Sequence, residues 1–283
     1  MLVATIMSKT STPISNLPSP ISHPGLLWSP VYALWWRDVI RFLRQRNRII
    51  GALATPLVFW LLVGSGFGPS FHNPGMASSD TSYLIYFFPG TIVLIMLFTA
   101  IFSTISVIED RREGFLQGAL VAPLSPAAIP LGKFLGGTTL AVLQALIFCL
   151  LAPFAGITIG WTQILLLLPA LILVGFSMTG LGFLVAWPMD STQGFHAIMN
   201  IFLMPLWMMS GALFPMSSGT GWLYWVALLN PVSYGVSALR NALSHPFYAE
   251  SLLSYGTSLL VTLLFGIVTF GISVYLVAHP KKK

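Results

Sequence analysis

Long uncharged stretches, each bounded by charged residues, make up most of this 283-residue chain. They cover residues 49–79, 81–108, 114–132, 134–189, 191–239 and 251–280. An α-helix needs about 20 apolar residues in succession to cross the hydrocarbon core of a membrane. The stretches are therefore long enough for membrane-spanning helices, and the helix-breaking residues within them decide how each one is divided.

Proline and glycine positions divide these stretches into six expected spans. Gly156–Gly160 separates two helices within the longest stretch, and Pro188 ends the second of them. Prolines 123, 126 and 130 exclude one continuous helix over 114–132, where we expect a short amphipathic helix and then a turn. The expected spans cover about 49–67, 83–108, 134–155, 163–187, 195–214 and 255–278.

The apolar segment 222–239 does not count as a seventh span. Asn230-Pro231 divides it into two halves, each too short to cross. With six spans, only Arg240 of the 13 Lys and Arg residues falls on the outer side. Because positive residues gather on the cytoplasmic side, both termini are expected in the cytoplasm and 222–239 is expected to be an outer re-entrant hairpin.

Composition supports an all-α integral membrane protein, which we expect in the plasma (inner) membrane. Hydrophobic residues make up 56% of the chain and charged residues only 7%, whereas a soluble domain carries roughly 25% charged residues. The net charge of +6 gathers beside the spans, which argues against a nucleic-acid partner. The Ser/Pro-rich residues 1–26 predict a disordered tail, and 281–283 form a basic tail around a membrane domain at 27–280.

Residues 29–48 have the pattern of an amphipathic helix, beginning at Ser29-Pro30. Val31, Trp35, Val39 and Phe42 share one face, and the opposite face carries Arg37, Arg41, Arg44 and Arg48. We expect this helix to lie in the membrane interface, with its apolar face among acyl chains and its arginines towards phosphates. Two interpretations stay open: the arginines only set topology, or the helix also contacts a cytoplasmic partner.

A run of five charged residues follows the second span. Its members are Glu109, Asp110, Arg111, Arg112 and Glu113, and apolar Phe115, Leu116 and Leu120 come next. A solvated loop is the simplest interpretation. However, a short apolar element that follows a group of charges is typical of a docking surface, so residues 109–126 are a candidate coupling segment.

Two stretches of the sequence resemble the permease subunits of type-2 ABC exporters, which export drugs, polysaccharides and lipo-oligosaccharides. One is EDRREGFLQGALVAPLSPAAIPLGK, residues 109–133, and the other is MMSGALFPMSSGTGWLYWVALLNPVSYGVSALR, residues 208–240. The resemblance covers 27–280 in the same order. Two positions depart from the family: Gln117 stands where many relatives carry Glu, and Ala122 where Thr or Ser is frequent.

The resemblance implies a partner that supplies the energy. No phosphate-binding loop is present, because Gly132-Lys133 is followed by Phe134 and Ala127 stands where the leading glycine belongs. ATP and Mg²⁺ are therefore expected on a separate ABC-type ATPase subunit, and two permeases, identical or different, would join two ATPases. Helix 114–122 would be the coupling element, residues 109–113 would pair with charges on the ATPase, and Asn230-Pro231 would lie in the outer hairpin.

The alternative function is a self-contained channel or secondary carrier, and a third is a structural or enzyme-tethering membrane protein. Ion-coupled carriers place ionisable residues inside their spans, and no Asp, Glu, His or Arg falls in the middle of any expected span. No catalytic residue set, cofactor-binding motif or metal-ligand pair is apparent either. The Met-rich fifth span suits an amphipathic or lipid-like substrate, and the family resemblance adds a glycan as a further class.

Overall fold

A computed structural model of the chain describes residues 28–67, 83–122, 124–213, 221–243 and 253–279, without the side chains of 46–48. Within these ranges every regular element is a helix. The predicted tails at 1–26 and 281–283 lie outside them.

Six of the helical segments are long and apolar enough to cross a membrane, which confirms the all-α class and the number of spans. They are α2 (Arg46–Phe67), α3 (Tyr83–Ser103) continued by α4 (Ile105–Arg112), α6 (Ala128–Cys149), α7 (Trp161–Ala186), α8 (Thr192–Trp207) continued by the π-helical turn η5 (Met208–Ala212), and α11 (Tyr255–Ala278).

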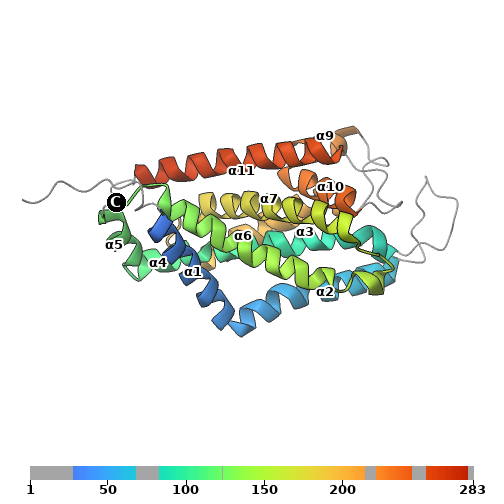
Figure 1. Cartoon of the computed structure of the whole chain (residues 1–283), viewed down its shortest axis with the longest axis horizontal. Helices are drawn as coiled ribbons and strands as arrows, with labels where there is room; N and C mark the ends of the chain where they lie inside the picture. The colour runs from blue at the N-terminus through green and yellow to red at the C-terminus, as the bar shows by residue number, and fades with distance from the viewer. Residues whose placement is uncertain (1–27, 68–82, 123, 214–220, 244–252, 280–283) are drawn as a thin grey trace, which may run out of the picture.

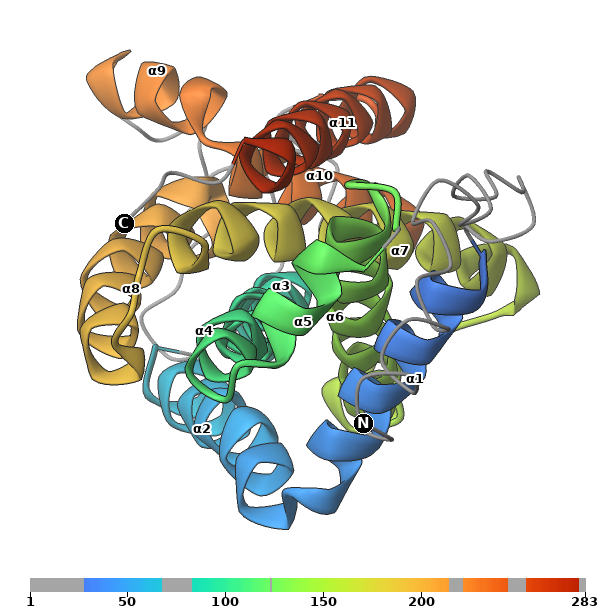
Figure 2. The same cartoon turned by 90° about the vertical axis from the view of Figure 1, so that its left-hand side faces the viewer.

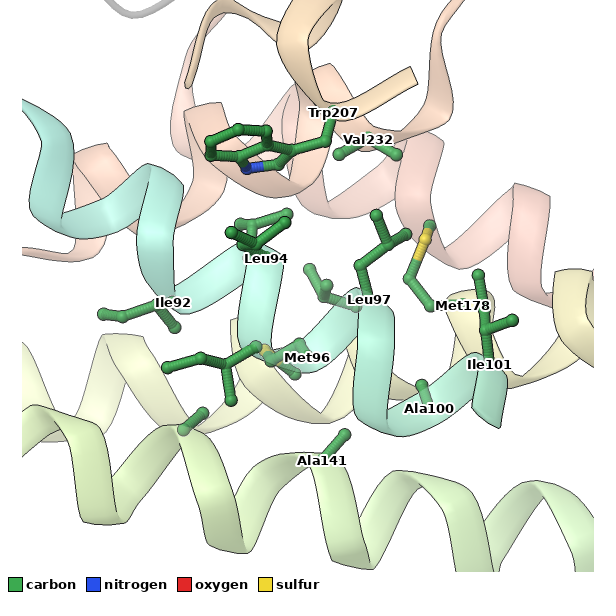
Figure 3. Close-up of a cluster of buried hydrophobic side chains, with 14 of the residues drawn as sticks. Ile92, Leu94, Met96, Leu97, Ala100, Ile101, Ala141, Met178, Trp207 and Val232 are labelled. Atoms are coloured by element: carbon green, nitrogen blue, oxygen red, sulfur yellow. The ribbon is translucent and has the colours of Figure 1, made fainter. Parts of the chain in front are cut away.

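The helices form an elongated bundle with α3 in its centre (Figure 1). α3 packs against α2, α6, α7 and α10 (Pro231–Leu243). Of the most apolar stretch of α3, 83% is buried, against 17% for α2 at the edge of the bundle. Figure 3 shows Leu94, Leu97 and Ile101 of α3 within the core, which also receives Met178 from α7 and Trp207 from α8.

Both boundaries of α6 differ from the expectation, and the first of them matters for the site. α6 begins at Ala128 rather than at residue 134, because Pro130 is its third residue, where a backbone N–H has no partner within the helix. α6 also ends at Cys149, and a 3₁₀ turn, η4 (Ala152–Ala155), completes the expected span. Lys133 therefore lies inside a spanning helix.

The second span is also longer than expected. Thr104 interrupts α3 and α4 only locally, and together they form a helical segment over Tyr83–Arg112. The charged run from Glu109 to Arg112 is thus helical and not a loop. Because successive residues of a helix point in different directions, the side chains of this charged run cannot all face the same surface.

The two ends of the bundle carry different elements (Figure 1). α1 (Trp28–Arg44), α4, α5 (Phe115–Val121) and the C-terminal end of α11 lie at one end, and α9 (Gly221–Leu229) and α10 lie at the other. The expected break falls at Asn230, between α9 and α10. Its side chain donates to the Leu206 carbonyl and accepts from the Val232 amide, so it joins the break to α8.

Candidate functional site

α1 packs along α6 through a seam of small residues. Gly132 and Gly136 lie one turn apart on α6, and a Cβ atom added at Gly132 would lie 2.7 Å from the Leu34 Cβ of α1. At Gly136 the nearest atom is the Asp38 Cβ, at 3.3 Å. Glycines at this spacing let two helices approach closely.

This packing corrects the expectation that the apolar face of the helix lies among acyl chains. Val31, Val39 and Phe42 are buried within the protein, and the Trp35 indole donates to the Thr139 hydroxyl at 3.0 Å. They face α6, where Gly132 and Gly136 leave room for the close approach of α1. A different set of side chains on α1, including Tyr32 and Trp36, stays exposed.

Lys133 is the centre of a buried group of charges. Its ammonium donates to the carboxylates of Asp110 at 2.6 Å and Asp38 at 2.9 Å, and to the Ser106 hydroxyl at 3.0 Å. Its side chain is 2% exposed and that of Asp110 is fully buried. Because isolated charges are costly to bury, these pairs hold α1, α4 and α6 together at one point.

Two arginines of α1 complete this group. Arg37 is hydrogen-bonded to Asp110, and Arg41 contacts Asp110 at 3.1 Å, Glu109 at 3.4 Å and Glu113 at 3.0 Å. Partial burial lowers the pKa of Arg41, and the three carboxylates more than offset this, so that its pKa is raised above the ordinary value. We call Asp38, Lys133, Asp110, Arg37 and Arg41 the charged cluster.

Arg111 extends in another direction, towards the end of α7. Its guanidinium donates to the carbonyls of Trp187 and Met189, lies 3.4 Å from the Asp190 carboxylate, and is 5.1 Å from the centre of the Trp187 ring. A cation there satisfies carbonyls that the helix end leaves unpaired. Arg111 thereby joins α4 to α7.

The residues of the expected docking surface differ in their exposure. Asp110 is buried, and Arg111 is engaged by contacts within the chain. Arg112 is exposed and makes no ion pair with any other described residue, and the Glu113 side chain stays 56% exposed. Arg44 is exposed at the end of α1, and the Arg48 side chain lies outside the described residues.

The short helix α5 follows α4 through a sharp turn. Gly114 adopts a left-handed φ of 77°, which turns the chain and favours glycine. Leu116, expected in the docking surface, is 3% exposed and packs inward within this chain. Phe115 lies beneath Arg37, whose guanidinium carbon is 3.7 Å from the ring centre.

The outward face of α5 carries Gln117, Leu120 and Val121, of which Val121 is 86% exposed. Figure 2 views this end of the bundle directly and shows α5 lying across it in front of the core helices. An exposed apolar face beside a charged cluster is the feature at this end that is best suited to bind another protein.

A second polar group lies at the opposite end, around η5. Arg240 of α10 donates to the Gly211 carbonyl at 2.7 Å and stacks over the Tyr86 ring at 4.5 Å. Tyr86 donates to the same carbonyl at 3.2 Å, and the Trp207 indole donates to the Gly90 carbonyl at 2.8 Å. The end of α8 that continues into η5 is thus fixed to α3 and α10.

No sequence pattern directly indicated either polar group. Lys133 and Asp110 pair because α4 continues past the expected span and α6 begins before it. The Gly211 carbonyl is available because η5 is a π-helical turn, and the sequence of η5 does not predict such a turn. Among the described residues, no group of three or more His, Cys, Asp or Glu side chains could hold a metal ion.

Comparison with known proteins places the chain in a family. The model of the family described as "ABC-2 type transporter" matches residues 30–244. The chain is 26% identical to a "Putative transport permease ycf38" of Cyanophora paradoxa, over 85% of this chain and 86% of that protein. It is 27% identical to "Nodulation protein J" of Rhizobium leguminosarum bv. trifolii, over 76% of this chain and 81% of that protein.

The family match covers α1 to α10, including the charged cluster, α5 and the Asn230 break. These two relatives also align over most of their own length. The chain belongs to the ABC-2 type transporter family and is a multi-pass membrane permease of the type-2 ABC class.

Proposed function

We propose that this chain is the membrane-spanning subunit of an ATP-driven exporter. A separate ABC-type ATPase binds ATP and Mg²⁺ and drives alternating access in a pair of permeases, identical or different. The exported substrate is amphipathic, lipid-like or a glycan. The observation that carries the proposal is the exposed face of α5 beside the charged cluster, at one end of a bundle of the ABC-2 family.

The α5 face has the features of a docking element for that ATPase. Leu120 and Val121 are apolar and exposed at an end of the bundle that is rich in charged residues. Arg112 and Glu113 come shortly before them in the chain, and both side chains are exposed and can make polar contacts. A groove on the ATPase would cover the apolar side chains, and the charges at the rim would set its orientation.

The charged cluster supports transmission of ATPase movement to the spans. Removing one partner of a buried ion pair costs about 3–5 kcal/mol. A displacement of α5 therefore carries α4, α1 and the start of α6 along as one body, since separating them would break the Lys133 pairs. Arg111 extends this body to the end of α7.

The distribution of positive residues supports a cytoplasmic location for this end. Arg37, Arg41 and Lys133 gather there, and of the basic side chains described Arg240 alone lies near the other end. Both termini are then cytoplasmic, α9 and α10 form an outer re-entrant hairpin, and lipid of the plasma (inner) membrane surrounds the spans.

The substrate class rests on α8. Met199 and Trp207 of this helix are buried in the core. Exposed apolar side chains lie on the other face of this helical segment, at Ile201, Phe202 and Met208. Such an apolar surface supports an amphipathic or lipid-like substrate.

A secondary carrier is the weaker candidate. The buried Lys133 and Asp110 are ionisable, as in ion-coupled carriers. However, they lie near the ends of α6 and α4 rather than halfway along a span, and they satisfy each other. This arrangement supports a structural connection better than an ion path.

Affinity purification of the full chain from native membranes tests the proposal. We expect an ABC-type ATPase to be recovered with it, and Leu120→Ala combined with Val121→Ala to reduce that recovery by about ten-fold or more. Leu150→Ala removes a 74% exposed apolar side chain beyond the far end of α6 and serves as the matched control. Recovery as a lone oligomer that conducts ions would overturn the proposal.

A further inference from the structure

A groove runs along the side of α1 that does not face α6. Its volume is about 440 Å³, and it is lined by Trp36, Arg37, Ile40, Arg41, Arg44 and Gln45. Leu34, Asp38 and Phe42 occupy the buried face of the same helix. The groove is therefore a separate surface from the seam with α6 and is open to a ligand.

Three guanidinium groups follow one another along this groove. Arg37 and Arg41 bind carboxylates on one side, yet their side chains stay 29% and 24% exposed. Arg44 is exposed and forms no ion pair with any residue that the structure describes. A guanidinium offers several N–H donors in a planar fork that fits a phosphate, so the groove suits a phosphate-bearing ligand.

The position of the groove indicates where that phosphate comes from. α1 ends at Arg44, α2 begins at Arg46, and the apolar part of α2 starts at Ile49. The residues that line the groove thus come directly before a candidate membrane-spanning helix in the sequence. α1 and α2 meet in an elbow at the edge of the bundle (Figure 1). The end of a spanning helix is where the hydrocarbon core gives way to lipid headgroups.

Exposed aromatic side chains on α1 agree with that depth. The rings of Tyr32 and Trp36 stack with centroids 6.5 Å apart, and both are exposed, as is Leu43 near the elbow. Amphipathic aromatic rings concentrate at the headgroup level of membranes. Trp36 and Ile40 give the groove apolar walls beside its arginines, which a soluble phosphate would not use.

We propose that this groove binds the headgroup of an anionic phospholipid, with Arg44 contacting the phosphate and with Trp36 and Ile40 packing against the glycerol and the upper acyl chain. The side chains that line this site belong to α1 and Gln45 and do not include the outward face of α5. The site does not depend on which ATPase or substrate the permease serves.

Lipid binding to the full chain tests this inference. The purified protein in detergent is titrated with phosphatidylglycerol or phosphatidylcholine, and bound lipid is counted by native mass spectrometry. We expect phosphatidylglycerol to bind several-fold more tightly, and Arg44→Gln to weaken it by about five-fold, since one basic residue near a membrane surface contributes about that factor. Arg44→Lys should retain most of the affinity.

Arg112→Gln is the matched control, because Arg112 is also exposed at this end and does not line the groove. It should leave phosphatidylglycerol binding unchanged, and the thermal unfolding of both variants should match the wild type. Equal binding of the two lipids would overturn the proposal. So would displacement of phosphatidylglycerol by millimolar inorganic phosphate, or a loss of ATPase association in Arg44→Gln with lipid binding intact.

Discussion

Lys133 and Asp110 form a 2.6 Å ion pair between two different helices, and both side chains are closed to solvent. Asp110 belongs to the end of the second span, and Lys133 to the beginning of the third. The turn at Gly114 and helix α5 lie between them in sequence. The segment that would meet an ATPase is therefore held at its base by a buried ion pair.

Removal of the Lys133 charge should destabilise the protein strongly. Lys133→Met leaves Asp38 buried without a cation, since Lys133 is its one ion-pair partner among the described residues. We expect a loss of about 3–5 kcal/mol in the free energy of unfolding. Thermal unfolding of the purified chain in detergent measures it.

The double variant Lys133→Met, Asp38→Asn should recover part of that loss. It removes one positive and one negative charge, and Asp110 keeps Arg37 and Arg41 as partners. A double variant as unstable as Lys133→Met alone would contradict this assignment of partners.

The seam between α1 and α6 should not tolerate a larger residue. Gly132→Val would drive side-chain atoms into Leu34 and separate the helices, at a cost of about 1–3 kcal/mol. Gly271→Ala is the control, because a Cβ at this helical glycine meets nothing within 4 Å and should be neutral or stabilising. Equal unfolding temperatures for the two variants would argue against close packing at the seam.

Loss of Arg240 should destabilise the region around η5 without affecting the end of the bundle that carries α4 and α5. Arg240→Met removes the hydrogen bond to the Gly211 carbonyl and the contact with the Tyr86 ring. A hydrogen bond to a charged group contributes about 1.5–3 kcal/mol. Hydrogen exchange should become faster over residues 208–213 and stay unchanged in α4 and α5; uniform or absent acceleration would contradict a local clamp.

Gly114 should be sensitive to substitution although it is exposed. Its φ of 77° strains any residue that carries a Cβ atom. Gly114→Ala should therefore lower the free energy of unfolding by about 1–2 kcal/mol, and Gly114→Asn should lower it by less. Gly118→Ala is the control, since this glycine lies within α5, has no positive φ and has nothing within 4 Å of its Cβ position. Transport activity and unfolding temperature should fall most for Gly114→Ala, less for Gly114→Asn and least for Gly118→Ala. Equal values for the three variants would contradict a role for the turn.

The spans were predictable because length and breakers act locally. Pro188, the Gly156–Gly160 break and Asn230-Pro231 end or divide helices where the sequence places them. α11 matches its expected bounds from Tyr255 to Ala278. Pro130 misled the prediction, because a proline in the first turn of a helix is compatible with it while a proline further along is not.

The charged cluster was not predictable, because it depends on tertiary packing. The arginine face of α1 was visible in the sequence, and so was the run from Glu109 to Glu113, yet nothing in either pattern shows that they face each other. The glycine seam that brings α1 onto α6 decides this, and it turns Asp110 inward while leaving Arg112 outside. The outward face of α5 is correspondingly smaller than the sequence indicated.

Site-directed cross-linking tests the central claim, that α5 docks onto a separate ATPase. The half-buried Cys149 is replaced by Ser, and a single cysteine is introduced by Val121→Cys on α5 or by Leu229→Cys on α9, both at exposed positions. We expect the cysteine at 121 to cross-link to an ATPase subunit in membranes and the one at 229 not to. Cross-linking from 229, or from neither position while the ATPase is still recovered with the chain, would contradict the account.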